Sequence, residues 1–146
     1  MILLPRPVDI KFRISSPFGK PRVINGREGV HRGVDFATPI GSDVFAIAGG
    51  PVFKAGWQNP DNHEEGFGFR IWQKVEVEDT KCDLFYGHLS EIFCQEGKYT
   101  GSGQKIALTG NTGGASTGGP STGPHIHIGL RKEATGEWLA ITFKEV

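Results

Sequence analysis

The chain has no excess of charge of either sign, since sixteen Lys and Arg residues balance sixteen Asp and Glu residues over 146 positions. A nucleic-acid-binding surface normally requires a cluster of basic residues, so the even balance argues against nucleic acid as a partner. Cysteine is scarce as well: Cys82 and Cys94 are the only two, and they lack the close Cys-x-x-Cys spacing of many zinc sites. Their spacing leaves both a disulfide and two free thiols open.

Long hydrophobic runs are also absent. Ile2-Leu3-Leu4 is followed by Pro5 and Pro7, so the N-terminus lacks the roughly 7 to 15 apolar residues of a secretory signal. We therefore expect no export signal in this chain, and no association with a membrane. No linker or second domain is evident, and 146 residues are enough to bury one hydrophobic core. The sequence predicts a single domain over residues 1–146, and we expect a monomer.

No segment shows a convincing helical pattern, and short apolar segments bounded by turn residues take its place. The run from Phe67 to Glu78 alternates apolar and polar residues over its second half, which is typical of a strand with one buried face. We expect strands at Val44–Ile47, Val52–Gly56, Phe69–Val77, Cys82–Gly87, Lys105–Leu108 and Ile126–Leu130. Many short strands predict an all-β fold, in which an antiparallel sheet packs on a second sheet in a β-sandwich-like arrangement.

A pair of histidines near the C-terminal end is the most informative motif that the sequence contains. His125 and His127 are two residues apart in the run Pro124-His125-Ile126-His127-Ile128. Residues i and i+2 of a strand lie on the same face, about 7 Å apart. We therefore expect both imidazoles on one face and the two isoleucines in the core.

A second pair, His31 and Asp35, lies far upstream in the sequence. Two residues four apart meet naturally on a helix but lie about 13 Å apart along a straight strand. The residues around them do not favour a helix, so we expect a loop that runs into a strand, with Gly33 permitting a bend. Such a bend would bring the imidazole and the carboxylate toward one point.

These two pairs offer four groups that suit a divalent metal ion. A catalytic zinc ion takes three nitrogen, oxygen or sulfur ligands from the protein and keeps a fourth position for water or substrate. Three of the four groups are therefore sufficient. The residue types alone do not decide whether His125 or His127 is the third ligand.

With these residues in place, the chain resembles the lysostaphin-type zinc endopeptidases, which cut peptide bonds in bacterial peptidoglycan. Four motifs carry the resemblance, in the order that the family has. They are Ser16-Pro17-Phe18-Gly19, His31-Arg32-Gly33-Val34-Asp35, Tyr86-Gly87-His88-Leu89-Ser90 and Ser121-Thr122-Gly123-Pro124-His125-Ile126-His127. The segment from Gly103 to Gly113 is similar to the strand and turn before the last motif, so the resemblance covers about residues 15 to 130.

The resemblance implies a role for each of five residues. By position, the zinc ligands would be His31, Asp35 and His127, and the two catalytic histidines that do not bind metal would be His88 and His125. Which of the two histidines is the general base stays open. The chain departs from the family directly after the last motif, where Ile128-Gly129 stands in place of an aromatic and an acidic residue.

The function implied by the resemblance is zinc-dependent hydrolysis of stem peptides or cross-bridges of peptidoglycan, in a groove formed by two sheets. The protein would act at the bacterial cell wall, whether extracellular, periplasmic or delivered by a phage. The zero net charge indicates that substrate recognition depends on shape. Two alternatives remain: a non-catalytic binding or activating module, and a virion structural module in which zinc stabilises the fold. A zinc carboxypeptidase is less favoured, because a wider spacing than that of His31 and Asp35 would be expected.

Overall fold

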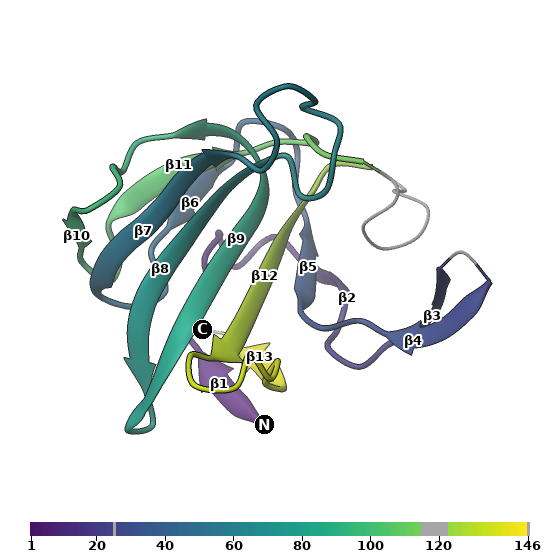
Figure 1. Ribbon diagram of the computed structural model, residues 1–146, viewed down its shortest axis with the longest axis horizontal. Coiled ribbons are helices and arrows are strands. Elements are labelled where there is room, and N and C mark those ends of the chain that lie inside the picture. The colour runs from purple at the N-terminus through teal and green to yellow at the C-terminus, as the bar shows by residue number, and fades with distance from the viewer. Residues whose placement is uncertain (25, 115–122, 146) are drawn as a thin grey trace.

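The computed structural model describes residues 1–24, 26–114 and 123–145 (Figure 1). The first two residues of the last family motif, Ser121 and Thr122, lie outside these residues. Within the described part of the chain we find strands and no helix, so no helix there could cross a membrane. The strands are β1 (Ile2–Leu4), β2 (Ile14–Ser16), β3 (Pro21–Ile24), β4 (Arg27–Val30), β5 (Val34–Ala37), β6 (Asp43–Phe45), β7 (Gly50–Trp57), β8 (Phe69–Val77), β9 (Thr80–Ile92), β10 (Tyr99–Thr100), β11 (Lys105–Thr109), β12 (His125–Lys132) and β13 (Ile141–Phe143).

One antiparallel sheet of nine strands dominates the fold. Seven of its strands follow the order β10-β7-β8-β9-β12-β5-β2, and β11 joins the far end of β9 and also pairs with β6. Two small sheets complete the structure: β1 pairs in parallel with β13, and β3 and β4 form an antiparallel hairpin. This hairpin projects away from the main sheet at the right of Figure 1.

The hydrophobic core lies between the main run of strands and the β6–β11 pair, which Figure 1 draws behind β7. Its members come from both layers: Val44 of β6 and Ile106 of β11 are buried in the same cluster as Ile71 of β8, Leu84 of β9 and Ile126 of β12. The second layer is therefore continuous with the first through β9, because that long strand pairs with β8 and β12 along most of its length and with β11 at its end.

An irregularity in β9 decides which way His88 points. The pairing of β8 with β9 shifts register here, since Phe69 lies opposite Leu89 while Ile71 lies opposite Tyr86. His88 has a φ of 62°, which is the left-handed region that few residues other than glycine adopt. Such a bulge breaks the alternation of faces. Tyr86 and Leu89 are consequently both fully buried in the core, while the His88 side chain borders a groove on the other face.

The predicted all-β antiparallel class is confirmed, and each of the six expected strands corresponds to an observed one. The bounds of β8, Phe69–Val77, are those expected, and β9 is longer than the predicted Cys82–Gly87. The sequence did not indicate the short strands β1, β2, β3, β4, β10 and β13. Cys82 and Cys94 are free thiols, which settles the alternative that their spacing left open.

Candidate metal centre

Strand register brings Asp35 and His127 together. In the antiparallel pairing of β5 with β12, Asp35 lies directly opposite His127, and Ala37 lies opposite His125. On its other side β12 pairs with β9, where His127 faces Gly87, the residue before His88. Opposed residues of an antiparallel pair have their Cβ atoms about 5 Å apart on one face. Three neighbouring strands therefore carry polar side chains to the same level of the sheet.

His31 joins this group from the loop between β4 and β5, as the sequence predicted. Gly33 makes that approach possible through its missing side chain: a Cβ there would lie 2.4 Å from the Ile128 carbonyl oxygen and 2.6 Å from the His127 ring. The chain bends at Gly33 as expected, and this bend needs no positive φ. Close packing against β12, and not a left-handed bend, requires glycine at this position.

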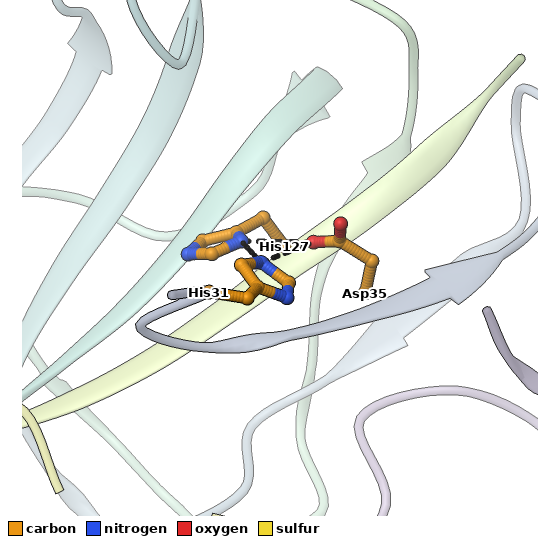
Figure 2. Close-up of side chains that lie close together, drawn as sticks. All are labelled: His31, Asp35 and His127. Atoms are coloured by element: carbon orange, nitrogen blue, oxygen red, sulfur yellow. Dashed lines mark hydrogen bonds and ion pairs between the residues drawn. The ribbon is translucent and has the colours of Figure 1, made fainter. Parts of the chain in front are cut away.

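The three expected metal ligands converge on one point (Figure 2). Nε2 of His31 lies 3.1 Å from Nδ1 of His127 and 3.4 Å from Oδ1 of Asp35, and Oδ1 of Asp35 lies 2.8 Å from Nδ1 of His127. In a tetrahedral zinc site with bonds of about 2.0 Å, the ligand atoms lie about 3.3 Å apart. The spacing of the three atoms matches that arrangement, and the residues are consistent with a bound metal ion.

Hydrogen bonds set the orientation of His31. Nδ1 of His31 lies 3.3 Å from the Pro17 carbonyl oxygen and 3.0 Å from the Ser16 hydroxyl oxygen. Because a carbonyl can only accept, a proton on Nδ1 satisfies the contact with Pro17, and Nε2 then keeps its lone pair. That lone pair points into the cluster. A hydrogen bond from the other ring nitrogen to a backbone carbonyl, as here to Pro17, is typical of histidines that bind metal.

The electrostatics of the cluster favour ligands in their metal-binding forms. Burial raises the pKa of the Asp35 carboxyl, but its hydrogen bonds with His127 and His31 and their charge outweigh this, so the pKa lies well below its usual range. Burial lowers the pKa of His127, although the neighbouring Asp35 opposes the shift. An ionised carboxylate beside a neutral imidazole is the state that a divalent ion requires.

The two histidines expected to be catalytic, His88 and His125, lie beside this cluster. The rings of His88 and His125 have centroids 4.6 Å apart, and the His88 ring lies 6.5 Å from that of His127. Nδ1 of His88 donates to the Thr112 carbonyl oxygen at 2.6 Å, and Nδ1 of His125 donates to the Gly123 carbonyl oxygen at 3.0 Å. In the neutral ring, each histidine thus has a lone pair left on Nε2.

Acid is expected to destabilise the metal-free protein, because burial lowers the pKa of His88 from 6.5 to about 4. Between these values the unfolded chain binds a proton that the folded chain does not. The free energy of unfolding is therefore highest above pH 6.5 and decreases as the pH falls. The contribution of His88 to this decrease is about 3 kcal/mol between pH 7 and pH 4. Urea unfolding of chelator-treated protein at both pH values measures the loss, and His88→Asn should reduce it. An equal loss in that variant would contradict the assignment.

A groove of about 460 Å³ contains all five side chains that the sequence singled out. One part of its lining comes from the segment 13–23, which contains β2, Lys20 and the start of β3, and another part comes from Phe67 and the segment 111–114. Phe67 packs against two of the histidines, with ring centroids 4.9 Å from His127 and 5.3 Å from His88. An aromatic wall of this kind limits access of water to the site.

Several residues at the site were not identified from the sequence. Thr112 and Pro17 orient His88 and His31 through their carbonyl oxygens, a role that no side-chain pattern reveals. Arg22 was missed too: its Nη2 donates to the Ser16 hydroxyl oxygen at 3.3 Å and lies 3.9 Å from Oδ2 of Asp35. Ser16 and Pro17 belong to a family motif quoted above, so that motif was the available signal for the support of His31.

Comparison with known proteins agrees with this geometry. The chain is 36% identical over 126 residues to the peptidoglycan DD-endopeptidase ShyA of Vibrio cholerae, which covers 85% of the chain and 26% of ShyA. The chain therefore spans about a quarter of the length of that relative. The crystal structure of the catalytic domain of lysostaphin from Staphylococcus simulans aligns with a TM-score of 0.66 at 32% identity, covering 84% of this chain and 81% of that one.

A second solved structure, a zinc-containing peptidase from Vibrio cholerae, aligns with a TM-score of 0.71 at 29% identity. The alignment covers 94% of this chain and 39% of that one. Residues 29–138, which include His31 and Asp35, His125 and His127, and the bulge at His88, match the family described as Peptidase family M23. The match extends over most of the chain and includes the three converging side chains, and the chain belongs to Peptidase family M23.

Proposed function

We propose that the chain is a zinc-dependent endopeptidase that hydrolyses peptide bonds in the peptides of bacterial peptidoglycan. The observation that carries the proposal is the convergence of His31, Asp35 and His127 on one point, inside a groove that also contains two further imidazoles. Membership of a peptidase family and the likeness to a peptidoglycan DD-endopeptidase support the substrate class. The likeness to a zinc-containing peptidase supports zinc as the ion.

The proposed ligands are Nε2 of His31, Oδ1 of Asp35 and Nδ1 of His127. A bound zinc ion would polarise the scissile carbonyl of the substrate and would lower the pKa of a bound water from near 16 to about 7. The second oxygen of Asp35 faces Arg22, which restrains the carboxylate. Together with the Pro17 contact to His31, this fixes two of the three ligands before any ion binds.

His88 and His125 are proposed as the catalytic histidines. With Nδ1 protonated and bonded to a carbonyl oxygen, each neutral ring offers Nε2 to the groove. One ring can accept the proton of the attacking water and pass it to the leaving amine, a step that contributes typically about 10² to 10⁴-fold. The other, once protonated, can donate a hydrogen bond to the developing oxyanion.

The bulge in β9 supports a functional role for His88. A histidine with a φ of 62° is uncommon, and residues held in sparsely populated conformations gather at functional sites. Here the bulge turns the imidazole out of the core and toward the ligand cluster. We accordingly propose a catalytic module over residues 1–146 that acts at the cell wall.

Removal of the metal tests this function. We expect chelator-treated protein to lose hydrolysis of purified peptidoglycan, and about one equivalent of zinc to restore it. The measurement is release of new amino groups, together with mass analysis of the fragments to identify the bond that is cut. A protein that binds zinc and peptidoglycan but releases no amino groups would instead be a binding or activating module.

A further inference from the structure

The groove is unevenly charged, although the chain as a whole is neutral. Three cationic residues, Arg13, Lys20 and Arg22, line the groove, and Asp35 is the one carboxylate among its described lining residues. Asp35 belongs to the ligand cluster, where its charge is matched by the neighbouring histidines or by an ion. The overall composition gave no sign of this local excess of positive charge.

All three cations come from the segment 13–23, which contains β2 and the start of β3. The Lys20 carbonyl oxygen accepts a hydrogen bond from the His31 amide at 2.9 Å, which places Lys20 beside one ligand. The Arg13 carbonyl oxygen accepts from the Ala37 amide at 3.1 Å, and Ala37 lies opposite His125. Arg22 lies beside Asp35 itself. The part of the lining that comes from Phe67 and segment 111–114 has no charged side chain.

Two of these cations have no partner for their charge within the described part of the chain. Arg13 and Lys20 are exposed residues, and the side chain of neither makes an ion pair or hydrogen bond with any described residue. Arg22 is different, because its side chain is 17% exposed and contacts Ser16 and Asp35 through one nitrogen. Its guanidinium has further N–H donors, and a carboxylate can accept two of them at once.

We propose that this cationic wall, defined as Arg13, Lys20 and Arg22, binds a free carboxylate of the substrate peptide close to the scissile bond. The inference rests on the proposed function and narrows the substrate class. It favours peptides that carry a carboxylate next to the bond that is cut, and it disfavours bridges made of glycine, which have no such group. Contacts with the exposed Arg13 and Lys20 are each worth up to about fivefold in affinity, and a charge-assisted hydrogen bond to the less exposed Arg22 about tenfold.

A bound zinc ion attracts carboxylates as well, so the test must separate the ion from the wall. Two peptides of equal length serve as probes: one has a free carboxylate on the residue after the scissile bond, and the other has a carboxamide there. Their dissociation constants are measured at low salt with the chelator-treated chain and with the zinc-loaded chain. Equilibrium binding needs no turnover, so a failure of the proposed hydrolysis would be seen separately.

In both forms we expect the chain to bind the carboxylate peptide about tenfold or more tightly than the carboxamide peptide. The double variant Arg13→Gln, Lys20→Gln should lose most of this preference. Arg27→Gln is the matched control, because Arg27 lies on the same hairpin as Arg22, is exposed and does not line the groove. It changes the net charge in the same direction and should keep the preference.

Added salt should weaken the preference, since exposed charges are screened. For the variant Arg22→Gln, zinc content is measured together with peptide affinity, because Arg22 also contacts the proposed ligand Asp35. Equal affinity of the parent chain for the two peptides, or no measurable binding of the carboxylate peptide, would overturn the proposal. A preference that appears only with zinc would place the carboxylate on the ion. A preference that survives in the chelator-treated double variant would show that Arg13 and Lys20 do not bind the carboxylate. Either result would overturn the proposal too.

Discussion

Replacing Asp35 with alanine is expected to reduce the zinc content from about one ion per chain to near zero, and to reduce peptidoglycan hydrolysis at least about a thousandfold. The physical reason is the position of Oδ1, which lies 2.8 Å from Nδ1 of His127 and 3.4 Å from Nε2 of His31. Without it, two imidazoles remain and no negative charge offsets the ion. Metal analysis and amino-group release on the same preparation measure both effects.

The matched control for this substitution is Asp43→Ala. Asp43 is an exposed carboxylate whose partner is Lys105, away from the groove, so its loss should leave zinc content and hydrolysis near the parent values. Asp35→Asn keeps the shape of the side chain and loses its charge, which separates a ligand effect from a packing effect. Full zinc occupancy in Asp35→Ala would remove Asp35 from the ligand set.

Replacing His88 with alanine is expected to leave zinc bound and to reduce hydrolysis by about 10² to 10⁴-fold, the usual contribution of a general acid or base. His88 borders the cluster without joining it: its Nδ1 bonds to the Thr112 carbonyl oxygen, and His31, Asp35 and His127 converge without it. The split between intact metal content and lost turnover is the expected signature.

The backbone at position 88 calls for a second variant. Because φ there is 62°, alanine adds backbone strain to the loss of the imidazole. Asparagine tolerates the left-handed conformation better, so His88→Asn should fold and bind zinc like the parent while remaining inactive. If His88→Asn hydrolyses peptidoglycan at the parent rate, the proposed catalytic role of His88 is wrong.

The sequence was sufficient for the all-β class because long strands such as β8 carry their own alternation of apolar and polar residues. Periodicity of two also predicted that Ile126 and Ile128 would be buried, while His125 and His127 face the groove, and both predictions are confirmed. Short strands were missed because their partners are distant: β1 pairs with β13, nearly the whole chain away. Two or three residues give no pattern to detect.

The approach of His31 and Asp35 to His127 could be expected from motifs, but the means of approach could not. Register places Asp35 opposite His127, and a missing Cβ at Gly33 lets the loop pack against β12. Both depend on contacts between segments more than ninety residues apart. The bulge at His88 could not be predicted from the local sequence either, because regular alternation would put His88 and Tyr86 on one face. The cationic wall could not be found from a net charge of zero.

Anomalous diffraction at the zinc absorption edge, from crystals of the zinc-loaded chain, shows whether His31, Asp35 and His127 hold one ion. We expect one strong peak at about 2.0 Å from Nε2 of His31, Nδ1 of His127 and an oxygen of Asp35, with a fourth position open to the groove. A peak at bonding distance from His88 or His125 in place of any of these ligands, or a peak outside the groove, would contradict the proposed zinc site.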